Sequence, residues 1–143
     1  FDPNLSPISL DTTARTAKDA ANSLNVDVGA IVKSLVFKPI KKNLYYLCLV
    51  SGDRFVSLKK LSLNLNEEVE KASANEVKNQ TGYSIGGVPP VAHINPPTQV
   101  LIDINLKRFN KIYAAAGHPF VVFGITFEQI CRITNGKVIS FVE

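Results

Sequence analysis

The stretch TGYSIGGVPPVAH, residues 81–93, has three glycines and two adjacent prolines between a helix-like and a strand-like segment. Glycine lacks a Cβ, so backbone amides can approach a bound group closely, whereas Pro89 and Pro90 fix φ and hold the loop in one shape. Such a loop can aim N–H groups at a carbonyl or phosphate oxygen. Glycine and proline are also common in connecting turns, so the stretch alone leaves both interpretations open.

The rest of the composition is typical of one folded domain. The chain has 143 residues, of which 45% are hydrophobic and 20% are charged, enough for a single core. No apolar run approaches the roughly 18 residues that span a bilayer, and the start, FDPNLSP, lacks the pattern of a secretory signal. We therefore expect a cytoplasmic protein with no membrane partner.

Charge and metal-binding residue types narrow the function only slightly. The net charge of +4 is compatible with a polyanionic partner but is not diagnostic. Cys48 and Cys131 stand far apart in apolar surroundings, which favours free thiols over a disulfide. The cysteines and the two histidines show no metal-ligand spacing, so we expect no metal and no cofactor.

Hydrophobic periodicity and capping residues divide the chain into an arm, residues 1–11, and one domain, residues 12–143. Four helices are predicted. The first covers residues 12–24 with Asp11 or Thr12 as its cap, and the second covers 58–65 with Ser57 as its cap and with Leu58, Leu61 and Leu65 facing inward. The third covers 74–80, begins at the capping box of Ser73 and Glu76 and ends at Gly82, and the fourth begins at the capping box of Thr126 and Gln129 and ends at Asn135 and Gly136. Strands are predicted at 31–38, 44–50, 99–104, 111–116, 119–125 and 137–142, and 67–72 stays undecided. This pattern predicts a single α+β domain, with a mixed, mainly antiparallel, curled sheet of about six strands and short helices on its faces.

Lys33 is unusual because of where strand alternation places it. It shares one strand face with Ile31, Leu35 and Phe37, whereas the opposite face carries the smaller polar Ser34. A lysine among large apolar side chains must reach solvent, pair with a carboxylate or open into a pocket. Asp103, in another predicted strand, is an obvious partner if the lysine is structural.

The other candidate residues are few, because the chain has no phosphate-binding P-loop, no nucleophile elbow and no zinc motif. Asp103 lies in a strand but could simply cap the following turn. His118 lies between two strands but could simply fill a β-turn. His93 follows the glycine-rich loop and is a weaker candidate, most simply a surface loop residue.

In this order, the segments resemble a known family. A helix ending in AANSLNV leads into VKSLVF, then a strand ending in SGD, then NEVKNQTGYSIGGVPPV, VLIDINL and AAAGHPFVVFGI. This arrangement resembles the YbaK-like aminoacyl-tRNA editing domain, whose fold also occurs as the insertion domain of bacterial prolyl-tRNA synthetases. The resemblance covers about residues 12–142, and its most specific part is T-G-Y-x-x-G-G-x-x-P, from Thr81 to Pro90, combined with the strand at Lys33.

The resemblance implies a free-standing aminoacyl-tRNA deacylase that hydrolyses the ester of mischarged tRNA in trans without a metal. Its implied substrate is alanyl- or cysteinyl-tRNA made by prolyl-tRNA synthetase, which is itself a possible partner. The implied catalytic residues are Lys33, Gly86 and Gly87, and the implied substrate-binding residues are Val88, Pro89, Pro90, Asp103, Gly117 and His118.

Two departures from the family's pattern bear on this expectation. Pro89 stands where the family tract has a serine, and Ala92 stands where it has its last glycine. These changes alter the polarity of the implied pocket. They keep open an alternative, in which the chain is a non-catalytic module that binds aminoacyl-tRNA or another protein.

Overall fold

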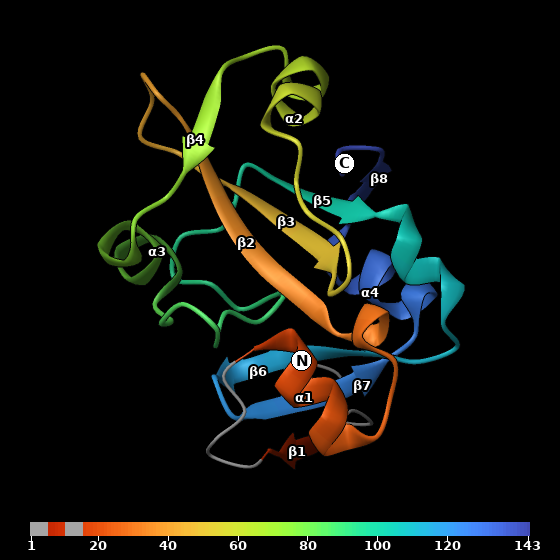
Figure 1. Cartoon of the computed structure of the whole chain (residues 1–143). Coiled ribbons are helices and arrows are strands. Elements are labelled where there is room, and N and C mark those ends of the chain that lie inside the picture. The colour runs from red at the N-terminus through yellow and green to blue at the C-terminus, as the bar shows by residue number, and fades with distance from the viewer. Residues whose placement is uncertain (1–5, 11–15) are drawn as a thin grey trace.

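Two β-sheets organise the chain in the computed structural model, which describes residues 6–10 and 16–143 (Figure 1). A five-stranded sheet has the order β4-β2-β3-β5-β8, and a three-stranded sheet has the order β1-β7-β6. The strands are β1 (Pro7–Ser9), β2 (Val32–Pro39), β3 (Tyr46–Ser51), β4 (Val69–Lys71), β5 (Gln99–Asp103), β6 (Ile112–His118), β7 (Val121–Ile125) and β8 (Lys137–Ile139).

Strand pairing is mixed and mainly antiparallel, as the sequence predicts. The parallel pairs are β3 with β5 and β5 with β8, and the other four pairs are antiparallel. The expected single sheet of about six strands is instead two sheets, because β6 and β7 pair with each other and meet β2 only through the bridge between Ile31 and Tyr113. Two strands are added to those expected, since residues 7–9 of the predicted arm pair with β7 and the undecided segment supplies β4.

Four short α-helices surround the sheets, and their ends follow local capping chemistry. They are α1 (Ala17–Leu24), α2 (Leu58–Leu65), α3 (Ala74–Thr81) and α4 (Phe127–Thr134), with 3₁₀ helices at Val28–Ala30 and Ile104–Arg108. Both predicted capping boxes form, at Ser73 and at Thr126. These side chains satisfy N–H groups that the first helical turn leaves without backbone partners.

Two local predictions need correction. Helix α1 begins after Thr16, whose hydroxyl accepts the Asp19 N–H, and the predicted caps Asp11 and Thr12 lie outside the described residues. Leu58 is exposed rather than inward, because it starts α2 beyond the edge of the core, and only Leu61 of that helix is fully buried.

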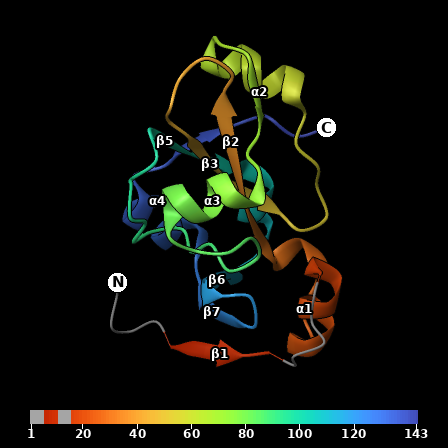
Figure 2. The same ribbon diagram turned by 90° about the vertical axis from the view of Figure 1, so that its left-hand side faces the viewer.

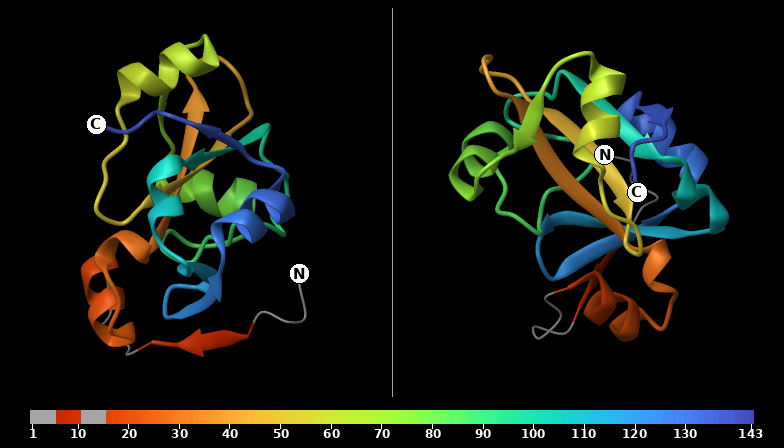
Figure 3. Two further views of the ribbon diagram at one scale, coloured as in Figure 1. Left: turned by 90° about the vertical axis from the view of Figure 1, so that its right-hand side faces the viewer. Right: turned by 45° about the horizontal axis from the view of Figure 1, so that its top comes forward.

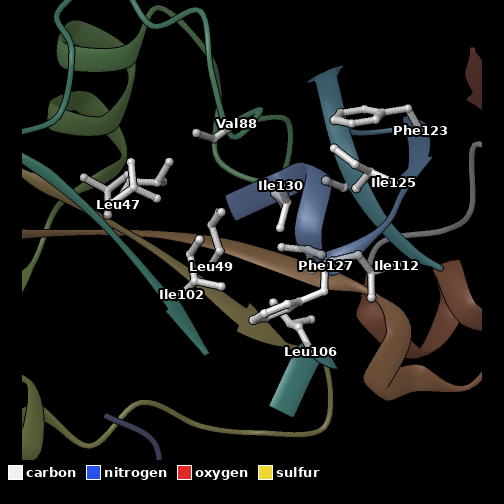
Figure 4. Close-up of a cluster of buried hydrophobic side chains, with 14 of the residues drawn as sticks. Leu47, Leu49, Val88, Ile102, Leu106, Ile112, Phe123, Ile125, Phe127 and Ile130 are labelled. Atoms are coloured by element: carbon white, nitrogen blue, oxygen red, sulfur yellow. The ribbon is translucent and has the colours of Figure 1, made fainter. Parts of the chain in front are cut away.

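The alternation of β2 separates two apolar clusters. Val32 and Val36 face the larger cluster, which joins the five-stranded sheet to α4 and β7, as Figure 4 shows for its central residues. Phe37 faces the other cluster, with Leu61 of α2. Helix α1 packs in a third cluster, against Ile31 and Val122, and it lies at the opposite end of the molecule from α2 (Figures 2 and 3).

One edge of β2 is left open between the two sheets. Strand β4 pairs only with Phe37–Pro39, and the start of β2 meets the smaller sheet through a single bridge between Ile31 and Tyr113. In Figure 1, β2 runs from β4 down to β6 and α1, with the glycine-rich loop beside it. This open edge is where the cleft described below forms.

Candidate active site

A cleft of about 590 Å³ lies along the open edge of β2. Its walls come from β2, the loop at 85–88, the β6–β7 pair and helix α1. Of the nine residues expected in the site, three line this cleft: Lys33, Gly86 and Val88. The structure therefore brings together the two halves of the most specific sequence motif.

Lys33 is half-buried, and it is one of the residues that line the cleft. Its Nζ donates a hydrogen bond to the Arg54 carbonyl oxygen and sits 4.7 Å from the centre of the Phe55 ring. Burial lowers the pKa of Lys33, an effect that Asp53 and Asp103 partly offset. No carboxylate among the described residues forms an ion pair with it, so the pairing with Asp103 that was considered for a structural lysine does not form.

The segment that holds the Lys33 ammonium is itself braced. Arg108 donates to both carboxylate oxygens of Asp53, at 2.7 and 3.1 Å, and to the Ser51 hydroxyl at 2.8 Å. The Arg108 hydrogen bonds lower the pKa of Asp53. This bidentate pair fixes the turn that presents the Arg54 carbonyl to Lys33.

The two central glycines of the loop play different parts. Gly86 lines the cleft, and its φ of +89° is a backbone conformation that favours glycine. The Gly87 N–H donates to Ser84 O at 2.9 Å, and a Cβ at Gly87 would come within 3.1 Å of the His118 backbone. Gly87 therefore closes a tight turn, and its amide is not available in the way the resemblance implies.

Val88, Pro89 and Pro90 anchor the loop to the core. Val88 is buried in the larger cluster and also lines the cleft (Figure 4). The Pro89 carbonyl accepts a hydrogen bond from His93 Nε2 at 2.6 Å, and Pro90 lines a different surface depression.

His93 connects the glycine-rich loop to the segment that leads into β3, through its contacts with Pro89 and Tyr45. Its Nδ1 lies 2.7 Å from the hydroxyl oxygen of Tyr45, and the Asn95 carbonyl oxygen lies 2.5 Å from the same hydroxyl. The expectation of a surface loop residue is wrong, because the ring is half-buried and stacks on Tyr45. Burial lowers the pKa of His93, with a smaller opposing effect from the Pro89 hydrogen bond.

This environment predicts a loss of stability when the pH falls from about 7 to 5. The folded pKa of His93 is lowered below its unfolded value of about 6.5, so the unfolded chain takes up the proton first. The contribution of neutral His93 is present above pH 6.5 and is lost as the pH falls through the folded pKa. We expect the melting temperature to fall more steeply over this range in the wild type than in His93→Gln, whose amide can still donate to Pro89. Equal slopes in the two proteins would contradict the assignment.

Asp103 lies outside the cleft and serves the fold. It is 1% exposed, and its carboxylate accepts from the Ser51 N–H at 3.1 Å and from the Asn105 backbone N–H at 2.9 Å. The Asn105 side-chain amide also donates to it, at 2.7 Å. The alternative interpretation, in which Asp103 caps the next turn, describes its observed contacts.

Gly117 and His118 lie at the β6–β7 turn, and neither lines the cleft. Gly117 has a φ of +100° and packs against the Tyr83 ring. The exposed His118 ring accepts the Phe120 N–H at Nδ1, at 3.2 Å, which is the turn-filling role considered above. Pro119 and Phe120, next in the chain, do line the cleft.

Several lining residues were not expected from the sequence. They are mostly apolar side chains brought from distant segments, such as Leu10, Ala20, Tyr113, Phe120 and Val122. Nothing local marks them, since their place depends on how the smaller sheet meets β2. Ser34 could have been singled out, because it is a serine between Val32 and Val36 on the strand face that packs in the core.

Metal-ligating types do not gather in the described part of the chain. Within residues 6–10 and 16–143, no group of three or more His, Cys, Asp or Glu side chains could hold a metal ion. Cys48 and Cys131 are both free thiols, as predicted, and Cys48 is fully buried. None of the helices described is long and apolar enough to cross a bilayer.

Comparison with known proteins identifies related chains. An uncharacterised Bacillus subtilis (strain 168) protein, YwhH, is 30% identical over 128 residues, which are 90% of this chain and 80% of YwhH. The proline–tRNA ligase of Thermosipho africanus (strain TCF52B) is 38% identical over 104 residues, 72% of this chain but only 18% of the ligase. A crystal structure of a protein proposed to be a trans-editing enzyme for prolyl tRNA synthetase superposes with a TM-score of 0.91 and 37% identity, covering 97% of this chain and 87% of that one.

A family model supports the same relationship over most of the chain. The model for the aminoacyl-tRNA editing domain matches residues 11–133, a range that includes β2, the glycine-rich loop and both strands of the β6–β7 pair. The chain therefore belongs to the aminoacyl-tRNA editing domain family.

Proposed function

We propose that this protein is an aminoacyl-tRNA deacylase that acts in trans in the cytoplasm on tRNA charged with the wrong amino acid. The observation that carries the proposal is the cleft in which Lys33 meets the glycine-rich loop at Gly86 and Val88. Membership of the editing-domain family and the similarity to a proposed trans-editing enzyme for prolyl tRNA synthetase support it. The substrate we propose is alanyl- or cysteinyl-tRNA for proline, produced by prolyl-tRNA synthetase.

The chemistry needs stabilisation of the negative charge that develops on the ester carbonyl oxygen. Backbone N–H groups fixed in a rigid loop can supply it without reorganisation. Gly87 N–H is engaged in the turn, whereas Gly86 and Val88 N–H donate to no protein group among the described residues. We assign the charge-stabilising role to these two amides.

Lys33 supplies the positive charge of the site. Its ammonium can shift from the Arg54 carbonyl toward a phosphate of the terminal adenosine or toward the ester carbonyl. Partial burial strengthens such an interaction relative to one in bulk water. The described cleft residues include no serine, cysteine or threonine paired with a histidine base, so the attacking group is water oriented by the tRNA's own terminal hydroxyl, without a metal.

A second candidate function is a non-catalytic module that holds aminoacyl-tRNA without turnover. The observation that favours it is the engagement of Lys33 with Arg54 O and the Phe55 ring, since a lysine fixed there would position the strand rather than the substrate. The presence of Pro89 where the family has a serine also favours a binding module over an enzyme.

The two functions give different products when the protein is incubated with tRNAs charged with alanine, cysteine, serine or proline. A deacylase releases free alanine or cysteine and spares prolyl-tRNA, as measured by labelled amino acid. A binding module protects the ester and retards the tRNA in a gel without release. Absence of both release and retention for every charged tRNA would reject both functions.

A further inference from the structure

Ser34 carries a hydroxyl group whose hydrogen-bonding capacity is unused. Its Oγ is buried from solvent and has no hydrogen-bond partner within the described residues. Buried hydroxyl groups in folded proteins are nearly always paired, because leaving one unpaired costs stability. An exception at the edge of a binding cleft suggests that the missing partner arrives with a ligand.

The position of Ser34 on β2 directs this hydroxyl toward the loop. Val32 and Val36 pack in the same cluster as Val88, and strand alternation puts Ser34 on their face. The strand edge is also open here, since β4 pairs only from Phe37 onward. Ser34 pairs with Leu49 of β3 on one side, and none of the described strands pairs with it on the side of the glycine-rich loop.

A small side pocket of about 50 Å³ opens beside Ser34. It adjoins the main cleft, because Ser34, Leu35, Ile85 and Val88 line both. Its remaining walls are apolar side chains at Val36, Ala72 and Val77, with the Lys71 side chain also contributing. A water molecule in the liquid occupies about 30 Å³, so the pocket has room for only one or two heavy atoms.

We propose that this side pocket receives the side chain of the amino acid whose ester is cleaved, and that Ser34 Oγ hydrogen-bonds a hydroxyl or thiol group on it. The inference rests on the proposed function and deepens it. The pocket excludes valine and larger residues by size. Among small residues it favours serine and cysteine over alanine, because a methyl group fills the space but leaves Ser34 unpaired. Of the two substrates proposed above, cysteinyl-tRNA is therefore preferred to alanyl-tRNA, and seryl-tRNA joins them as a third substrate.

The test uses adenosine analogues that carry the amino acid through a stable 3′-amide instead of the ester. We expect wild-type protein to bind the seryl analogue at least about tenfold more tightly than the alanyl analogue, with the cysteinyl analogue in between because a thiol is the weaker partner. In Ser34→Ala the seryl affinity falls by about tenfold and the alanyl affinity stays the same. Ser140→Ala, on an exposed serine outside both pockets, should keep the wild-type preference.

A second variant tests the size of the pocket. Ala72→Val adds two methyl groups to its wall, so binding of the seryl, cysteinyl and alanyl analogues should weaken while that of the glycyl analogue is kept. Melting temperatures of both variants check that the fold is intact.

The outcomes separate this inference from the proposed function. Equal affinities for the seryl and alanyl analogues, an equal loss of both in Ser34→Ala, or no binding of any analogue would overturn the pocket assignment. If the analogues bind with the expected preference but the matching charged tRNAs are not hydrolysed, the deacylase proposal fails and the pocket assignment stands.

Discussion

Replacing Lys33 with alanine is expected to lower deacylation by roughly a hundredfold or more while the protein stays folded. This is the size of effect seen when one strong electrostatic contact to a transition state is lost. The free energy of unfolding should change by no more than about 1 kcal/mol, because the variant loses one hydrogen bond to Arg54 O and also removes a partly desolvated charge. Single-turnover deacylation and urea denaturation of the same preparations measure the two quantities.

Controls separate a catalytic from a structural lysine. Lys59→Ala, on the exposed face of α2, should leave both activity and stability unchanged. Lys33→Arg keeps the charge but not the compact ammonium geometry, so it should also be impaired. Wild-type rates in a stably folded Lys33→Ala protein would remove Lys33 from the site, and a parallel loss of stability and activity would make it structural.

Replacing Asp103 with alanine is expected to destabilise the fold by about 3 kcal/mol or more. The change leaves the Ser51 N–H and both Asn105 donors without their buried acceptor, and each such loss carries a desolvation cost. Asp27→Ala is a matched control, because Asp27 caps the other 3₁₀ helix through Gly29 N at 2.9 Å but is exposed, so its loss should cost only about 1 kcal/mol.

Activity of the Asp103→Ala protein decides between its two possible roles. Below the melting temperature, the folded protein should hydrolyse substrate near the wild-type rate, since Asp103 does not line the cleft. A large loss of activity in a protein of unchanged stability would instead assign Asp103 to substrate binding, the role that the family resemblance implies.

The helices could be predicted from sequence because their ends are set by residues a few positions apart. Ser73 with Glu76 and Thr126 with Gln129 satisfy the first-turn N–H groups locally, whatever the rest of the chain does. Strand β2 was predictable for the same reason, since its alternation is contained in eight residues. The meeting of Lys33 with Gly86 could be expected only through the family resemblance.

The remaining features depend on contacts between distant segments, which no local pattern encodes. The pairing of Pro7–Ser9 with β7 turns a predicted arm into a strand. His93 looked like a surface loop residue because its partner, Tyr45, belongs to a strand far away in the chain. The family resemblance implied a substrate-binding role for Asp103, and only the three N–H groups that donate to its carboxylate show that it stabilises the fold.

Because the segment at β1 contributes to the cleft, the cleft can form only after distant parts of the chain have been synthesised. Leu10 lines the cleft, and its N–H donates to Phe120 O, so a wall that emerges early from the ribosome is held by a turn that emerges late. A nascent chain that ends before β7 therefore has neither the docked β1 nor the β6–β7 wall. Contacts between such distant segments also form slowly. The cleft consequently forms only after β7 has been translated, and partly made chains lack it.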